Sequence, residues 1–114
     1  MQKQIDLSVV IPNRNSPFLI KTIQDVLDHA GCEVEVIVNI DENWVNWEVN
    51  DERVHYIHPS SPIGLRAGVN ACVAMAKGKY IMKTDDHCGF GENFGKILIE
   101  NHKRTEERVA VLEA

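Results

Sequence analysis

The tripeptide Asp85-Asp86-His87 places two carboxylates and one imidazole next to each other in the chain. Adjacent carboxylates repel each other unless a cation neutralises their charge. Oxygen ligands with one imidazole suit Mn²⁺ or Mg²⁺, and such ions commonly complete their coordination shell with the phosphates of a substrate. The alternative is an Asx-type turn in which all three side chains are solvated. The tripeptide alone is compatible with both interpretations, so its position relative to other polar residues matters.

Two further polar clusters follow segments that have the pattern of buried strands. Residues 12–15 follow the apolar run 5–11, and Asp41 follows the run 33–40. In an open parallel sheet, ligands bind outside the carboxyl ends of the strands, where the strand order reverses. Asn and Asp are also common turn formers, which explains any one of the clusters without a function. Three clusters predicted for the same edge of one sheet favour a binding site there.

The hydrophobic pattern of the whole chain alternates between strand and helix periods. Strands are predicted at Ile5–Ile11, Glu33–Ile40, Arg53–His58 (at a sheet edge), Lys79–Thr84 and Arg108–Leu112. Helices are predicted from Ser16 as N-cap and Pro17 in the first turn to Gly31, from Ser61-Pro62 to Gly78, and from Glu92 to Thr105. The order β-α-β-β-α-β-α-β is typical of an α/β fold, with a mostly parallel sheet and helices on both faces.

Composition and charge limit the classes of protein to which the chain can belong. The 114 residues suit a single domain, and 44% hydrophobic with 25% charged residues is typical of a globular protein. The formal net charge of -5 comes from 12 Lys and Arg against 17 Asp and Glu, and the segment Asp41–Glu52 contains acidic residues but no Lys or Arg. The sequence has no basic stripe of the kind that binds nucleic acid, so we expect no nucleic-acid partner.

Cysteine use and hydropathy predict the compartment. Cys32, Cys72 and Cys88 are odd in number and share no Cys-x-x-Cys spacing, which predicts free thiols in a reducing compartment. No stretch of the sequence approaches the ~20 apolar residues of a membrane span, and the first four residues lack the apolar core of a signal peptide. We therefore expect a cytoplasmic protein without a transmembrane segment.

Five motifs along the chain together carry a family resemblance. They are Ser8–Asn15, Val36–Asp41, Gly64–Asn70, Ala76–Ile81 and Asp85-Asp86-His87. Their order and spacing resemble the N-terminal, nucleotide-sugar-binding half of a family 2 inverting glycosyltransferase with the GT-A fold. The corresponding family motifs are a first strand ending in Pro-Thr-Tyr-Asn, a second ending in Val-Asp-Asp-Gly-Ser, a Gly-x-x-x-Ala-Arg-Asn helix, Ala-x-Gly-x-Tyr-Ile, and DXD. The resemblance implies a Rossmann-like GT-A half-domain over residues 1–114.

The resemblance also implies a role for each matching residue. The substrate-binding residues are Pro12, Asn13, Arg14 and Asn15 around the base and ribose, Asp41 on the base, Arg66 as a cation, and Asp85 and Asp86 at the ribose and diphosphate. The implied metal ligands are Asp85 and His87, with Mn²⁺ or Mg²⁺ bridging the diphosphate. Because the carboxylate at the position of Asp41 commonly binds uracil, the implied donor is a UDP-sugar. A departing nucleoside diphosphate gains negative charge, which a metal ion and a nearby arginine stabilise.

The sequence departs from the family pattern at four positions. His87 replaces the final Asp of DXD, and its imidazole is still a ligand for Mn²⁺. Ile40 stands where the first Asp of the Asp-Asp pair is usual, which leaves one carboxylate to bind the base. Val69 occupies the Arg position of Ala-Arg-Asn, and we expect Arg66, one helical turn earlier, to supply the cation. Arg14 replaces an aromatic residue, so stacking on the base would come from its guanidinium plane.

The function expected from these observations is metal-dependent transfer of a sugar from a UDP-linked donor to an acceptor that the sequence does not identify. An inverting transferase needs a general base for the acceptor hydroxyl. The resemblance places this carboxylate beyond residue 114, so no residue of the chain is assigned as catalytic. One alternative is therefore a truncated donor-binding half-domain without turnover.

Another alternative is a nucleotidyltransferase-like enzyme that uses the same acidic edge. A Gly-rich phosphate loop after the first strand would favour it, and residues 13–17 contain no glycine. A half-domain also leaves a strand edge or apolar sheet surface uncovered, which predicts homo-oligomers.

Overall fold

The computed structural model describes residues 4–13, 18–40, 49–58, 64–84, 89–104 and 111–113. Within these ranges the secondary-structure elements follow the predicted order. The strands are β1 (Leu7–Asn13), β2 (Val34–Ile40), β3 (Val54–Ile57), β4 (Tyr80–Lys83) and β5 (Val111–Glu113), and the helices are α1 (Leu19–His29), α2 (Gly64–Met75) and α3 (Phe94–Arg104). Across the described part of the chain, no helix combines the length and the apolar character needed to cross a membrane.

The five strands form one sheet in the order β3-β2-β1-β4-β5, and all four neighbouring pairs are parallel. β1 is central, because it pairs with β2 on one side and with β4 on the other. The chain adds β2 and β3 on the first side and then returns to add β4 and β5 on the second. The strand order therefore reverses between β1 and β4, which is where open parallel sheets bind ligands.

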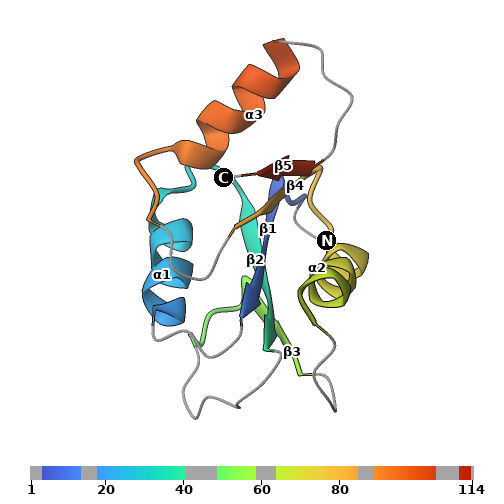
Figure 1. The fold of residues 1–114 in the computed structure, drawn as a ribbon. Coiled ribbons are helices and arrows are strands. Elements are labelled where there is room, and N and C mark those ends of the chain that lie inside the picture. The colour runs from blue at the N-terminus through green and yellow to red at the C-terminus, as the bar shows by residue number, and fades with distance from the viewer. Residues whose placement is uncertain are drawn as a thin grey trace.

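Helices cover both faces of the sheet, with α1 and α3 on one face and α2 on the other (Figure 1). The larger core lies under α1 and α3 and joins alternate residues of β1 and β2 to Ile23 and Ile99. The smaller core lies under α2 and joins Val10, Ile37 and Cys72. Because both faces of the sheet are covered at β2, every residue of this strand is buried, including the polar residues Glu35 and Asn39. The predicted α/β class, with a parallel sheet and helices on both faces, is confirmed.

Helix α1 begins later than predicted. Phe18, and not Ser16, occupies its N-cap position, and no side chain among the described residues caps the helix. The amide and the hydroxyl of Thr22 both donate to the carbonyl oxygen of Phe18, each at 3.0 Å, and these bonds fix the first turn. The prediction of Ser16 as N-cap and Pro17 in the first turn is therefore wrong, and both residues lie outside the described ranges. The predicted end is confirmed, because Gly31 follows the helix with a φ of +72°.

Candidate functional site

The carboxyl ends of β1, β2 and β4 lie at the same edge of the sheet. Asn13, the last residue of β1, pairs with Ile40, the last residue of β2. Directly after β4, the amide of Thr84 donates to the carbonyl oxygen of Val10 at 3.0 Å. The predicted convergence of these three strand ends is therefore confirmed.

This carboxyl edge is stepped between β1 and β4. Lys83, the last residue of β4, pairs with Val10, whereas β1 continues to Asn13. At about 3.3 Å per residue, β1 extends roughly 10 Å beyond the end of β4. The step lies where the strand order reverses, so β1 continues past the last residue of β4 that pairs with it.

Most of the predicted site residues follow the carboxyl edge in sequence and lie outside the described residues. These are Arg14 and Asn15 after β1, Asp41 after β2, and Asp85, Asp86 and His87 after Thr84. The described residues contain no group of three or more side chains able to hold a metal ion. The predicted metal ligands Asp85 and His87 are not among the residues to which this statement applies.

Pro12 and Asn13 form the end of β1 at this edge. Asn13 is 1% exposed and Pro12 is half-buried. Because side chains alternate along a strand, Asn13 faces the α1 side of the sheet and Pro12 faces the α2 side. Of these two residues, Pro12 offers the larger accessible surface.

Helix α2 brings Arg66 to the carboxyl edge. Arg66 is exposed in the first turn of α2, which begins at Gly64. Gly68 lies against β2, since a Cβ on Gly68 would be 2.7 Å from Nδ2 of Asn39. Asn39 is the next-to-last residue of β2, so this contact holds the start of α2 at the carboxyl edge. The helix N-terminus and the guanidinium of Arg66 both favour an anionic group there.

The residue at the arginine position of the family motif faces the sheet. Val69 packs against the core formed by Val10, Ile37 and Cys72. A valine suits this apolar environment better than a charged side chain does. Among the described residues, Arg66 is therefore the arginine at the start of α2 that is exposed and can contact an anionic ligand.

Two polar side chains that the sequence analysis did not single out lie beside the strand ends. Asn39 is 1% exposed and Thr84 is 2% exposed. Within the described ranges, neither Oδ1 of Asn39 nor Oγ1 of Thr84 has a hydrogen-bond partner. A buried polar atom without a partner costs about 1–3 kcal/mol, and in native proteins a water, an ion or a ligand often supplies the missing bond. Their signal in the sequence is a polar residue within or directly after an apolar strand.

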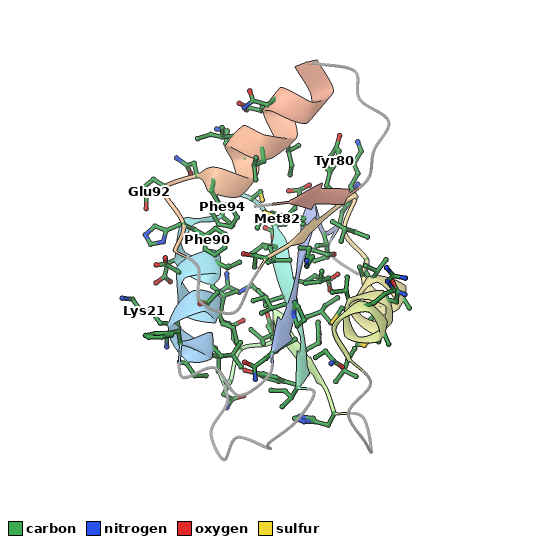
Figure 2. The ribbon with its side chains drawn as sticks, in the orientation of Figure 1. Lys21, Tyr80, Met82, Phe90, Glu92 and Phe94 are labelled. Atoms are coloured by element: carbon green, nitrogen blue, oxygen red, sulfur yellow. The ribbon has the colours of Figure 1, made fainter. Side chains whose placement is uncertain are left out.

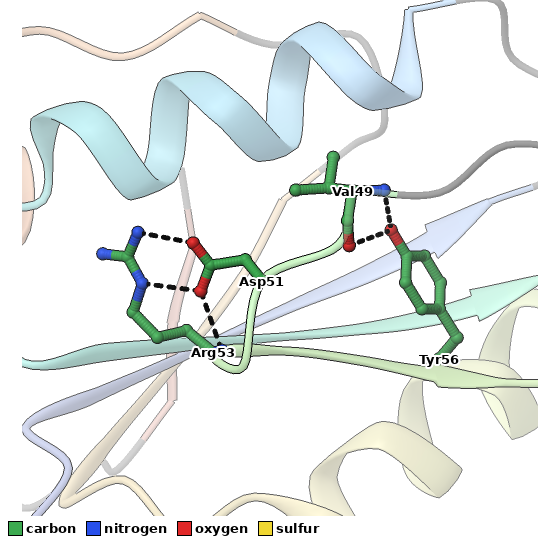
Figure 3. Close-up of polar contacts among 4 residues, drawn as sticks. All are labelled: Val49, Asp51, Arg53 and Tyr56. Carbon is green, nitrogen blue, oxygen red and sulfur yellow. Dashed lines mark hydrogen bonds and ion pairs between the residues drawn. The ribbon is translucent and has the colours of Figure 1, made fainter.

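The acidic segment Asp41–Glu52 ends at the opposite edge of the sheet, because β3 runs parallel to β2 and begins at the amino edge. There the amide and Nε of Arg53 each donate to Oδ1 of Asp51 at 2.9 Å, and Nη2 donates to Oδ2 at 2.9 Å (Figure 3). These hydrogen bonds lower the pKa of Asp51 to about 2. Nearby, the amide of Val49 donates to the hydroxyl of Tyr56 at 2.8 Å. These contacts shape the turn into β3 and lie away from the candidate site.

The described cysteines are free thiols, as predicted. Burial is the main cause that raises the pKa of Cys32 to about 11 and that of Cys72 to about 12. A raised pKa disfavours the nucleophilic thiolate, so neither thiol suits covalent catalysis. Cys88 lies outside the described residues.

An apolar cavity of about 350 Å³ borders the end of β4 on the α1 face. Its side-chain lining comes from Met82, Phe90, Glu92, Phe94, Ile97 and Leu98. Figure 2 shows Met82, Phe90 and Phe94 gathered in the region between β4, α1 and the start of α3. The lining includes residues on both sides of the segment 85–88, which carries the predicted metal ligands.

Comparisons with known proteins agree with this architecture. Among the solved structures similar to the chain is the crystal structure of S. aureus TarS 1-349, with a TM-score of 0.76 and 15% sequence identity. The match covers 90% of this chain and 33% of that chain, so this chain spans about a third of the TarS chain. A search of curated proteins gives no significant match. The family model described as Glycosyl transferase family 2 matches residues 8–113, which include every described helix and strand apart from Leu7, the first residue of β1, and the chain therefore belongs to glycosyl transferase family 2.

Proposed function

We propose that the chain forms the nucleotide-sugar-binding part of a glycosyltransferase that moves a sugar from a UDP-linked donor to an acceptor, with Mn²⁺ or Mg²⁺ at the diphosphate. One observation carries the proposal: the ends of β1, β2 and β4 meet at one edge, and each is followed in sequence by a candidate site residue. Membership of the family supports the class of reaction. The reversal of strand order between β1 and β4 supports the position of the ligand.

The residues after β1 and β2 have the chemistry to bind the nucleoside. In the proposal, the carboxylate of Asp41 accepts a hydrogen bond from the N3–H of uracil. The guanidinium of Arg14 stacks on the base, and Asn15 bonds the ribose. Pro12 and Asn13, at the described end of β1, form the floor of this nucleoside pocket.

The residues after β4 fit a divalent cation. A carboxylate of Asp85 and the imidazole of His87 form a donor set that suits Mn²⁺, and Asp86 remains for the ribose or diphosphate. A bound cation supplies positive charge that stabilises the departing diphosphate. Arg66 and the N-terminus of α2 add positive charge at the same edge of the sheet.

The chain orients the donor, and the proposal assigns none of its residues as the general base. An inverting transfer needs a general base that deprotonates the acceptor hydroxyl, and the proposal leaves this group unassigned. This chain spans about a third of the TarS chain, which favours a second candidate for the chain on its own, namely donor binding without turnover.

The experiment that tests the proposal is calorimetry of UDP binding with Mn²⁺ and with EDTA. We expect Mn²⁺ to strengthen UDP binding to the wild-type chain. Asp85→Ala should lower the affinity at least tenfold, which is about 1.4 kcal/mol. Glu52→Ala is the matched control, because Glu52 is an exposed carboxylate at the amino edge and its loss should leave UDP binding unchanged.

The same samples separate the alternatives. UDP binding that is indifferent to both Mn²⁺ and Asp85→Ala contradicts the proposed metal site. Release of UDP from a UDP-sugar by the chain supports turnover, whereas tight binding without release supports the donor-binding candidate. Release of pyrophosphate from a nucleoside triphosphate indicates the nucleotidyltransferase-like alternative.

A further inference from the structure

A cavity of about 300 Å³ lies at the amino edge of the sheet, where β2 and β3 begin. The charged and titratable side chains of its lining are Glu33, Glu35, Glu52, Arg53, His55 and Lys77. Glu35 and Ile40 are five positions apart in β2, so at about 3.3 Å per residue the cavity lies roughly 16 Å from the carboxyl edge. It is therefore separate from the candidate donor site.

Glu35 places a buried carboxylate in the lining of this cavity. The residue is 3% exposed, and its Oε2 accepts hydrogen bonds from the hydroxyl of Ser8 at 2.6 Å and from the amide of Lys77 at 2.7 Å. Nε2 of His55 lies 3.6 Å from Oε1, which is too far for a hydrogen bond. Among the described residues, no hydrogen bond reaches Oε1. The second oxygen of the carboxylate thus remains available to a ligand in the cavity.

The described contacts of Glu35 need its oxygen but not its charge. The hydroxyl of Ser8 and the amide of Lys77 both donate to one oxygen atom, and the side-chain carbonyl of a glutamine would accept the same two bonds. A buried carboxylate also costs more free energy than a neutral amide unless a cation is paired with it. A cationic ligand at Oε1 would offset this cost.

The charges around the cavity also favour a cation. The exposed side chains of the lining balance one another, because two carboxylates stand against two cations. The carboxylates are Glu33 and Glu52, and the cations are Arg53 and Lys77. The charge that remains is that of the buried Glu35, which salt screens less than it screens exposed groups. The C-terminal end of α2, which leads through Lys77 to the start of β4, adds partial negative charge at this edge.

Ile5 and Val34 complete the lining with apolar surface. Apolar walls beside one buried carboxylate suit a cation that carries a short alkyl chain. We propose that the cavity is a second ligand site, which binds a small primary alkylammonium ion whose nitrogen donates a hydrogen bond to Oε1 of Glu35. The proposal does not depend on the proposed function, because the two sites share no residue.

The test is a titration of the chain with n-butylammonium, n-butanol and butyrate at equal ionic strength, followed by the backbone amide NMR signals. The three probes have the same chain length and differ in charge. We expect n-butylammonium to shift the amide signals of Arg53, His55 and Lys77 in a saturable way. Neither n-butanol nor butyrate should do so, because neither carries the positive charge that pairs with the carboxylate.

Two variants assign the binding to the buried carboxylate. Glu35→Gln keeps an oxygen for Ser8 and Lys77 and removes the charge, so it should lower the affinity for n-butylammonium at least tenfold. Glu52→Gln is the matched control, because Glu52 is an exposed carboxylate of the same lining, and it should change the affinity less than about threefold. Urea denaturation checks that both variants fold. If Glu35→Gln does not fold, the comparison of the three probes on the wild-type chain still decides.

The proposal is supported if n-butylammonium binds with saturation and a folded Glu35→Gln variant loses this binding while Glu52→Gln keeps it. Equal shifts with n-butanol or butyrate would contradict it, because they would assign binding to the apolar walls or to the exposed cations. The absence of shifts at these amides, or equal affinity in folded Glu35→Gln, would also overturn it. The results with UDP and Mn²⁺ test the carboxyl edge and leave this proposal unaffected.

Discussion

The hydroxyl of Thr84 is a buried polar group at the carboxyl edge. No hydrogen bond among the described residues offsets the free energy lost when it is removed from water. The residue is 2% exposed, and Oγ1 has no hydrogen-bond partner among the described residues. Valine has nearly the same shape as threonine and no hydroxyl. We expect Thr84→Val to raise the free energy of unfolding of the unliganded chain by about 1 kcal/mol, measured by urea denaturation.

Thr22→Val is the matched control for this prediction. Thr22 is equally buried, and its hydroxyl donates to the carbonyl oxygen of Phe18 at 3.0 Å. Its replacement should lower the free energy of unfolding by about 1 kcal/mol. A loss of stability in Thr84→Val as large as that in Thr22→Val would show that the Thr84 hydroxyl has a partner in the unliganded chain.

Single residues were predicted well where their role depends on sequence neighbours and poorly where it depends on distant ones. The position of Arg66 at the start of a helix followed from the local pattern, and the structure confirms it. The contact of Asp25 with Phe90 joins residues 65 positions apart and has no local signal. Asn39 was missed because a polar residue inside an apolar strand does not show whether its side chain has a partner.

At the scale of elements, the connection from α2 to β4 sets the register that places Thr84 at the carboxyl edge. The amide of Gly78 donates to Oγ of Ser8 at 2.8 Å, and this hydroxyl donates to Oε2 of Glu35 at 2.6 Å. The amide of Lys77 donates to the same carboxylate oxygen at 2.7 Å. Partly buried hydrogen bonds therefore join the segment that leads into β4 to β1 and β2.

Gly78→Ala should destabilise this connection. A Cβ on Gly78 would lie 2.5 Å from Oγ of Ser8 and 2.6 Å from its backbone nitrogen, so the backbone of β1 or of residue 78 must move. We expect a loss of about 1–3 kcal/mol in the free energy of unfolding, typical of overpacking. Gly91→Ala, where a Cβ would meet no atom within 4 Å, should change it by less than about 0.5 kcal/mol. Equal stability of the two variants in urea denaturation would contradict the assigned contact.

The order and type of the elements were predictable because each apolar pattern is local. The strand β2 is rich in Val and Ile, which favour strands, and α1 has a clear apolar stripe at helical spacing. The start of α1 was not predictable, because Ser16-Pro17 is a strong helix-start signal. The structure instead begins the helix after Phe18, where Thr22 supplies the bonds of the first turn.

At the scale of the whole molecule, the sequence predicted a parallel sheet but not its strand order. The order depends on which side of β1 each later strand joins, and that choice is made by packing between distant segments. The edge position of β3 was predicted and is confirmed. Self-association through an uncovered edge or face stays a prediction; β3 and β5 are the edge strands of the described sheet.

The strand order determines where the segments that carry the candidate site residues begin. β4 lies beside β1 on the side away from β2, so the segments after β2 and β4 start on opposite sides of the end of β1. In the proposed function, the ligand lies between these two segments. The amino edge, by contrast, holds the turn in which Asp51 is neutralised by Arg53.

The central claim, that a divalent cation and a nucleoside diphosphate bind at the carboxyl edge, is tested most directly by paramagnetic broadening of backbone amide NMR signals. The measurement uses UDP with substoichiometric Mn²⁺, and Mg²⁺ is the diamagnetic control. The two edges of β1 are about 20 Å apart at about 3.3 Å per residue, which is far enough to separate them. We predict the strongest broadening at Asn13, Ile40 and Thr84 and little at Leu7 and Val34. Broadening centred on Leu7 and Val34, or none at either edge, would contradict the claim.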